Sequence, residues 1–344
     1  MAKPTVLVRA ELTDGATERL RTFADVRHEP GISKETLLQE RPAVQGIIAS
    51  GSGAVWYDAQ LMDALPGLRI ISRTGVGYEV VDVRAATERG IAVATAPGTN
   101  AVSVAEMTFF LMLGVARNYP LAGRIARSGT NWREPKVWMS MRGRELYGKT
   151  LGVIGVGNIG SRVALRARAF GMPVIGYDPY VDKPRAARAG VTLTRLENVL
   201  RKADVLSIHC PQTEETTRMI DAERLALMKP TAILINTARG GIIDEPALID
   251  ALRNGVISGA GLDVYDPEPP LPGNPLFDME NVVLMPHQAG VTDEAWTAIC
   301  DAAVQNVRAI FKGGKPFHVV NAEVLKKPFA VSRQPSAPER KRKG

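Results

Sequence analysis

Short apolar runs alternate with amphipathic segments along nearly the whole chain. In the first hundred residues the apolar runs have strand length, and the segments between them repeat their apolar positions at helical spacing. The expected strands are Thr5–Ala10, Gly46–Ser50, Arg69–Thr74 and Ile91–Ala96, and the expected helices are Ala16–Phe23, Ala59–Leu65 and Asp82–Arg89. Apolar strands that alternate with helices predict a parallel sheet covered on both faces.

The alternation breaks at Pro97–Asn100, which we interpret as a hinge. Immediately after it, Ser103 and Glu106 have the spacing of a helix capping box. The helix expected from there, Val104–Arg117, is apolar on nearly all sides. Such a helix is expected to be buried, in a core or in a subunit interface.

A second alternating series begins at Lys149. Its expected strands are Lys149–Gly155, Pro173–Asp178, Val205–Cys210, Ala232–Arg239, Gly259–Tyr265 and Asn281–His287. Six strands separated by helical segments are typical of a complete Rossmann sheet. The last helical pattern, Asp293–Phe311, is followed by no further strand of this series. We therefore expect this helix to return to the first domain and pack there.

The pattern therefore predicts an α/β protein with two Rossmann-like domains, each a doubly wound parallel sheet. The first domain is expected to be discontinuous, formed by residues 1–99 and 291–325, and to bind the substrate. The second, residues 100–290, is expected to be an inserted nucleotide-binding domain. Residues 326–344 are expected to be a disordered basic tail.

A glycine-rich motif, Gly155–Val156–Gly157–Asn158–Ile159–Gly160, follows the first strand of the second series. Alone, G-x-G-x-x-G is a weak signal that a simple turn also satisfies. Here an apolar strand precedes it and a helical segment follows it, as in dinucleotide-binding domains. The glycines permit a tight turn and let a pyrophosphate approach the backbone at a helix N-terminus.

Asp178 stands at the end of the next strand, 23 residues beyond Gly155. A carboxylate at this place accepts hydrogen bonds from the adenosine ribose and repels the 2′-phosphate of NADP. No Arg or Lys follows Asp178 before Lys183, so we predict NAD as the cofactor.

Three residues that suit chemistry on a 2-hydroxy or 2-oxo acid follow late strands of the second series: Arg239, Glu268 and His287. A guanidinium can hold a carboxylate bidentately, and a histidine can exchange a proton with the C2 oxygen near neutral pH. A carboxylate can orient that histidine and stabilise its charged form. Each residue alone would more often be a surface or turn residue, and only their combination favours catalysis.

The segments VIGVGNIG, INTARGGIIDEPAL, GAGLDVYDPEP and NVVLMPHQAG closely resemble those of the D-isomer-specific 2-hydroxyacid dehydrogenases. The resemblance runs from about Thr5 to Ala322. It implies that Arg239 binds the substrate carboxylate, that His287 is the general acid and base, and that Glu268 is its partner. It also implies that Val76 and Gly77 bind the carboxylate from the first domain. The cofactor contacts implied are Gly155, Gly157, Asn158, Ile159, Gly160, Asp178, Cys210, Pro211, Thr216, Thr237, Ala238, Asp263 and Gly290.

Within this family the substrate expected is a small unphosphorylated acid such as hydroxypyruvate or glyoxylate. The loop Ser50–Gly53 lacks the arginines with which phosphoglycerate dehydrogenases often hold a phosphate. Phosphoglycerate is the second candidate substrate, because Arg73 or an Arg of a partner subunit could replace the missing phosphate-binding arginines. A hypothesis from a different functional class is an NAD(H)-sensing binding protein, because the chain also resembles the C-terminal-binding corepressors.

The net charge of +7 does not alter this functional interpretation, because most of it lies in the tail. The segment from Lys326 to the end holds seven basic residues and one acidic residue. A charge confined to such a tail does not predict nucleic-acid binding. Two distant cysteines predict neither a disulfide framework nor a metal site and favour a cytoplasmic setting. No apolar run is long enough to span a membrane. The resemblance and the apolar Val104–Arg117 helix favour a homodimer, and Trp138 is expected either in its core or near a neighbouring active site.

Overall fold

The computed structural model describes residues 2–40, 43–50 and 56–326. Most of the Ser50–Gly53 loop and of the basic tail lies outside these residues. The described chain forms two compact units, one from residues up to 99 together with those from 293 onward, and one from residues 100–292. Each unit contains one parallel sheet, which confirms the α/β class with two Rossmann-like sheets.

The sheet described in the first unit has the strand order β2-β1-β3-β4-β5, and all of its strands run parallel. Its strands are β1 (Thr5–Val8), β2 (Asp25–His28), β3 (Gly46–Ala49), β4 (Ile70–Arg73) and β5 (Ala92–Ala94). Its helices are α1 (Asp14–Arg21), α2 (Lys34–Glu40), α3 (Ala59–Ala64), α4 (Val83–Glu88), α13 (Asp293–Lys312) and the short η3 (Ala322–Lys326).

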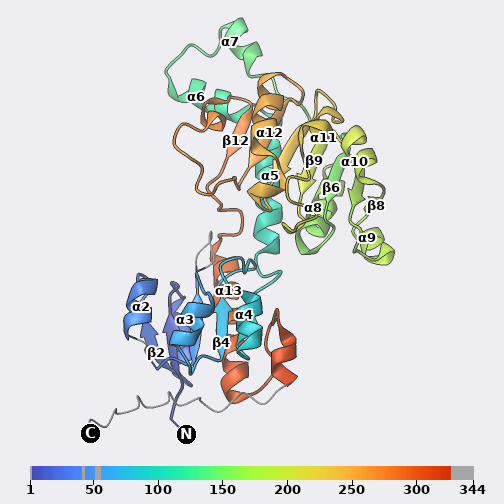
Figure 1. Cartoon of the computed structure of the whole chain (residues 1–344). Helices are drawn as coiled ribbons and strands as arrows, with labels where there is room; N and C mark the ends of the chain where they lie inside the picture. Colours follow the sequence, from blue (N-terminus) through green and yellow to red (C-terminus); the bar gives the residue numbers. More distant parts are fainter. Residues whose placement is uncertain (1, 41–42, 51–55, 327–344) are drawn as a thin grey trace, which may run out of the picture. The chain divides into compact units, whose positions relative to one another are not determined.

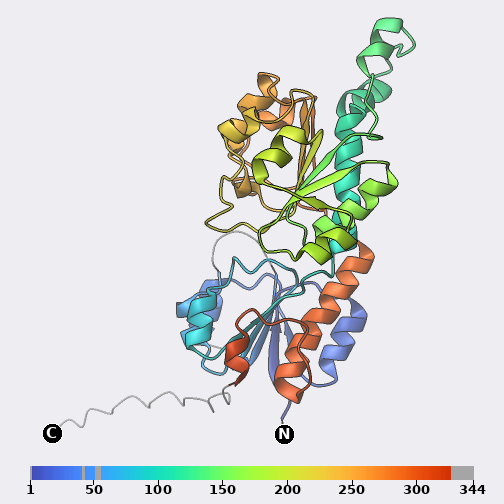
Figure 2. The ribbon, with the colours of Figure 1, turned by 90° about the vertical axis from the view of Figure 1, so that its right-hand side faces the viewer.

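Helices cover both faces of this sheet because successive strand side chains point to opposite faces. Val6 and Val8 of β1 pack with α1 and α13, whereas Leu7 packs with α2 and α3 on the other face. Figure 2 shows α13 in orange beside α1 in blue on one side of the strands.

The sheet described in the second unit has the order β12-β11-β10-β9-β6-β7-β8, also parallel throughout. Its strands are β6 (Leu151–Ile154), β7 (Val174–Tyr177), β8 (Thr192–Leu193), β9 (Val205–Ile208), β10 (Ile233–Asn236), β11 (Gly259–Leu262) and β12 (Val282–Leu284). Its helices are α5 (Ala101–Ala116), α6 (Tyr119–Arg127), α7 (Pro135–Ser140), α8 (Asn158–Ala169), α9 (Lys183–Arg188), α10 (Leu196–Lys202), α11 (Ala222–Ala226) and α12 (Glu245–Arg253), with the short helices η1 (Gly240–Ile242) and η2 (Pro275–Asp278).

The chain order reverses at β6, whose neighbours β7 and β9 lead in opposite directions across this sheet. Such a switch point opens a crevice at the carboxyl ends of the strands, where open α/β sheets bind ligands. Helix α5 packs against β10, β11 and β12, whereas α8 packs against β6 and β7, and the two helices contact each other. Leu111 of α5 and Val163 of α8 share one core cluster with Val153 of β6.

The capping box expected at Ser103 is wrong. Helix α5 begins at Ala101, and its N-cap residue Asn100 makes no side-chain cap. Ser103 lies inside the helix, and its hydroxyl is 2.9 Å from that of Thr292. The tertiary contact therefore replaces the local one that the spacing suggested.

No single helix of the described residues is long and apolar enough to cross a membrane, and only α5 and α6 together, bent by 71°, meet that length and composition. Eleven of the sixteen residues of α5 are buried.

Candidate active site

The glycine-rich turn between β6 and α8 requires glycine at two of its three positions. Gly155 has φ of 87°, and a Cβ there would lie 2.6 Å from the backbone nitrogen of Cys210. A Cβ on Gly160 would lie 2.0 Å from the carbonyl oxygen of Gly155. A Cβ on Gly157 would meet nothing within 4 Å, so the space beside this residue is open. The turn therefore fits a cofactor phosphate that approaches at Gly157.

Asp178 is fixed beside this turn by backbone groups. Its Oδ2 accepts a hydrogen bond from the N–H of Val156 at 2.8 Å. Its Oδ1 accepts from the N–H groups of Tyr180 and Val181 at 2.9 and 3.0 Å. These bonds hold the carboxylate in one orientation at the end of β7, where a ribose would meet it.

The loop after β9 lies against the glycine-rich turn, because Gly155 and Cys210 are in close contact. Thr216 shapes this loop, since its hydroxyl donates to the carbonyl of Pro211 at 2.7 Å. Burial raises the pKa of Cys210 to about 11, so its thiol is neutral at physiological pH.

Arg239 lies on the turn that follows β10. The Asn236 side chain brackets this turn, because it accepts from the N–H of Ala238 at 3.0 Å and donates to the carbonyl of Arg239 at 2.9 Å. Gly240 lets the turn touch the loop after β11, since a Cβ there would lie 1.8 Å from the carbonyl oxygen of Tyr265. The Arg239 turn and the loop that leads to Glu268 are thus packed together.

The Glu268 carboxylate meets His287 across the loops that follow β11 and β12. The distance between Glu268 Oε1 and His287 Nδ1 is 2.5 Å. Both side chains stay accessible, with 27% of Glu268 and 42% of His287 exposed. A carboxylate at this distance orients the imidazole through Nδ1.

The buried Asp263 holds the turn that carries His287. Its Oδ1 accepts from the N–H of Gln288 at 2.7 Å, and its Oδ2 accepts from the N–H of Ala289 at 3.0 Å. Its carbonyl accepts from the N–H of His287, a residue with φ of 55°. Burial raises the pKa of Asp263 against the opposing effect of the two N–H groups. Sequence reasoning assigned Asp263 to the cofactor and missed this positioning task, which only the fold reveals.

The remaining predicted residues are less informative. Thr237 is buried, with its hydroxyl 3.3 Å from that of Thr108 on α5. Gly290 lies against Asn100, since a Cβ there would be 2.5 Å from Asn100 Nδ2. Val76 and Gly77 lie in the first unit on the turn after β4, where the carbonyl of Gly77 accepts from Arg73 Nε at 3.1 Å.

His209 can be set aside as an acid or base near neutral pH. Its Nε2 is 2.8 Å from the Ser207 hydroxyl, and burial lowers its pKa to about 3. It is therefore neutral at physiological pH. Among the described residues no group of three or more His, Cys, Asp or Glu side chains could hold a metal ion.

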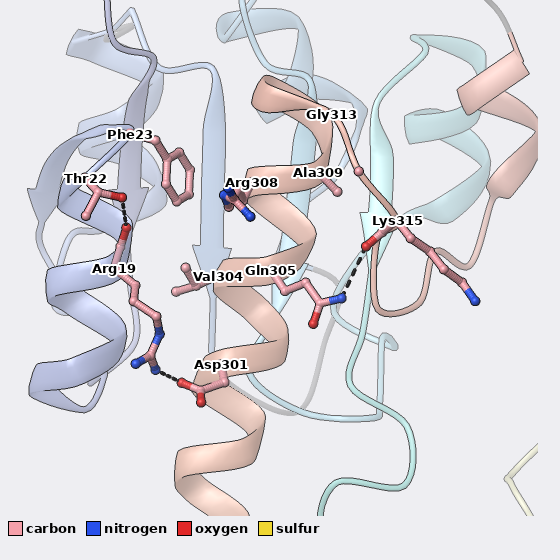
Figure 3. A pocket seen from close by; sticks show the side chains of 11 residues that line it. Arg19, Thr22, Phe23, Asp301, Val304, Gln305, Arg308, Ala309, Gly313 and Lys315 are labelled. Carbon is pink, nitrogen blue, oxygen red and sulfur yellow. Dashed lines mark hydrogen bonds and ion pairs between the residues drawn. The ribbon is translucent and has the colours of Figure 1, made fainter.

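A cavity lies elsewhere, between α1 and α13 in the first unit (Figure 3). It has a volume of about 540 Å³ and an ion pair between Arg19 and Asp301 at its wall. Gln305 donates to the carbonyl of Lys315 at 3.2 Å across it. It brings together no acid–base pair of the kind seen at His287, and we do not identify it as the active site.

The comparison with known proteins decides the family. Residues 109–289 match the family described as D-isomer specific 2-hydroxyacid dehydrogenase, NAD binding domain. This chain belongs to that family. Its second unit is therefore an NAD-binding domain.

Relatives of known name agree with this assignment to the D-isomer specific 2-hydroxyacid dehydrogenases. The D-3-phosphoglycerate dehydrogenase of Methanocaldococcus jannaschii is 41% identical over 317 residues, which cover 92% of this chain. This chain spans only 59% of the length of that relative. The glyoxylate reductase of Korarchaeum cryptofilum is 37% identical over 94% of this chain and 98% of its own length. The crystal structure of the TT0316 protein of Thermus thermophilus matches with a TM-score of 0.83, at 38% identity over 92% of this chain and 99% of that one.

Proposed function

We propose that this protein is an NAD(H)-dependent dehydrogenase that interconverts a small D-2-hydroxy acid and its 2-oxo acid. The observation that carries the proposal is the contact between Glu268 and His287 at 2.5 Å, in an NAD-binding domain and beside the Arg239 turn. Family membership rests on the sequence and this pairing rests on the geometry, so the two support the proposal from separate observations.

Each of the three residues has a separate task in this proposal. His287 exchanges a proton with the substrate C2 oxygen through Nε2, because Nδ1 is occupied by Glu268. Glu268 keeps the imidazole oriented and stabilises its charged form. Arg239 binds the substrate carboxylate, for which a planar guanidinium offers two parallel donors. Bound NAD(H) supplies or accepts the hydride.

The substrate that we favour is hydroxypyruvate or glyoxylate, with 3-phosphoglycerate as the second candidate. Support comes from the glyoxylate reductase of Korarchaeum cryptofilum, which this chain matches over nearly all of that enzyme's length. The similarity to 3-phosphoglycerate dehydrogenases keeps the phosphorylated acid as a competitor.

For the cofactor we propose NAD(H) over NADP(H). The Asp178 carboxylate, fixed by three backbone N–H groups, would repel a 2′-phosphate. We expect kcat/KM to favour NADH over NADPH by at least roughly tenfold, which corresponds to about 1.4 kcal/mol. Equal efficiencies with the two cofactors would contradict this role of Asp178.

The test of the whole proposal is a steady-state assay of NADH oxidation with glyoxylate, hydroxypyruvate and 3-phosphohydroxypyruvate. We expect turnover with at least one of them and a loss of about 100-fold or more in His287→Ala. A protein that binds NADH but reduces none of a broad panel of 2-oxo acids would instead support the NAD(H)-sensing alternative.

We also propose that the protein is a homodimer built on the second unit. Figures 1 and 2 show α6 and α7 extending away from its sheet. The segment from Tyr119 to Ser140, which contains α6 and α7, exposes apolar side chains, including 42% of Trp132 and 58% of Trp138. On the neighbouring helix α5, Phe110 is 43% exposed. Exposed apolar surface of this kind marks an interaction site.

A further inference from the structure

Two arginine side chains converge on Asn158, the first residue of α8. Arg162, one helical turn later, donates through Nη1 to the carbonyl of Asn158 at 2.7 Å. Arg185 of α9 donates through Nη2 to the Asn158 side-chain oxygen at 3.2 Å. Helix α9 follows β7, so the fold brings Arg185 back to the glycine-rich turn although 27 residues separate it from Asn158.

Neither guanidinium forms an ion pair with a carboxylate of the described residues. The two nearby acids are engaged with backbone groups instead. Asp178 accepts from Val156, Tyr180 and Val181, and Asp182 caps α9 by accepting the backbone N–H of Arg185. The two guanidinium groups thus donate to one uncharged residue and pair with no carboxylate of the described residues, so both remain able to bind an anion beside Asn158.

The place for that anion is beside Gly157, where the turn leaves open space next to Asn158. We propose that Arg185, together with Arg162, binds the pyrophosphate of NAD(H), with Asn158 as the residue that positions Arg185. This inference rests on the NAD(H) binding of the second unit. The pyrophosphate is favoured over a 2′-phosphate because Asn158 follows Gly157 at the helix start, whereas the ribose belongs at Asp178.

Direct titration of cofactor binding, without substrate, tests the proposal. Arg185→Gln should weaken NADH binding about fivefold, the upper range for an exposed charged contact. NADPH and ADP-ribose should weaken by the same factor because they share the pyrophosphate. Adenosine, measured by displacement of NADH, should bind unchanged. Arg188→Gln, which changes another exposed arginine of the same helix, is the matched control and should bind all four as the wild type does.

Salt and a double-mutant cycle separate an electrostatic role from a structural one. The loss in Arg185→Gln should shrink when sodium chloride is raised to about 0.5 M, because salt screens exposed charges. Asn158→Ala should weaken NADH binding too, and Arg185→Gln should have a smaller effect in that background than in the wild type.

Three outcomes would overturn the inference. Unchanged NADH affinity in Arg185→Gln would remove Arg185 from the cofactor site. A loss confined to NADPH would move its partner to the 2′-phosphate. A wild-type protein that does not bind NADH would refute the cofactor site itself, and so the proposed dehydrogenase as well, whereas normal NADH binding without turnover would refute only the dehydrogenase.

Discussion

The pairing of Glu268 with His287 depends on residues that position the two side chains and take no part in the proposed reaction. Asp263 fixes the turn that carries His287, and Gly240 allows the loop before Glu268 to pack against the Arg239 turn. The family resemblance implied that Glu268 is the partner of His287, whereas the 2.5 Å distance between them comes from the structure. The sequence alone does not join Arg185 to Asn158, because 27 residues separate them and only the fold brings them together.

Glu268→Gln is expected to reduce kcat for 2-oxo acid reduction by about 10- to 100-fold while KM changes little. The amide keeps the shape and an acceptor for His287 but removes the charge that stabilises the imidazolium. Steady-state kinetics at saturating NADH measure both constants. Arg239→Lys is the contrasting variant, since it keeps the charge, loses the two parallel donors and should raise KM.

If Glu268→Gln turned over 2-oxo acids at the wild-type rate, the carboxylate would not assist His287. The contact between them would then be structural.

His209 gives a prediction about stability against pH. Burial lowers its pKa to about 3, below the ordinary value of about 6.5, so the unfolded chain binds this proton more readily than the folded one. The folded protein should therefore lose up to about 1.4 kcal/mol per pH unit from this group as the pH falls below 6.5. His209→Gln, which can still bond Ser207, should flatten that dependence.

Urea unfolding of both proteins between pH 7 and 4.5 measures the difference. Parallel curves of unfolding free energy against pH for His209→Gln and the wild type would show that His209 takes up its proton equally in both states.

At the scale of elements, two substitutions in the glycine-rich turn should separate cofactor binding from stability. Gly157→Ala places a methyl group in open space, so the thermal unfolding midpoint should stay while NADH binding falls at least about tenfold, because the methyl occupies the phosphate approach. Gly160→Ala places it 2.0 Å from the Gly155 carbonyl and should lower the unfolding free energy by about 1–3 kcal/mol. Calorimetry and NADH titration of both variants check this. Gly157→Ala binding NADH normally would place the phosphate elsewhere.

Most strands could be predicted from sequence because buried parallel strands are nearly continuous apolar runs, as Gly46–Ala49 is throughout and Ile233–Asn236 is up to Asn236. The strand β2 was missed because it lies at a sheet edge, where Asp25 and His28 are exposed and hydrophobic patterning is weak. The strand β8 has only two residues and is also at an edge. The helix α2 escaped notice because Leu37 is its one buried residue.

At the scale of the whole molecule, the dimer proposal is tested by sedimentation velocity. Val102, Phe110 and Leu113 form an exposed stripe on α5, since their spacing puts them on one helix face. We expect the wild type to sediment at twice the 37.1-kDa chain mass, and Phe110→Asp/Leu113→Asp to sediment as the single chain. Phe317→Asp, on an exposed aromatic of the first unit, is the control. A wild type that is monomeric at micromolar concentration would contradict the proposal.

The two-segment construction of the first unit has a consequence for biosynthesis. Val6, Val8 and Ile70 form their core with Cys300, Ala303, Val304 and Val307 of α13. A ribosome makes the strands of this sheet first and must add the entire second unit before α13 emerges. Helix α1 covers part of this apolar face early, but the part that α13 covers stays exposed until α13 emerges, and chaperones can bind such a surface. The first unit can therefore complete its core only after the second unit has been synthesised.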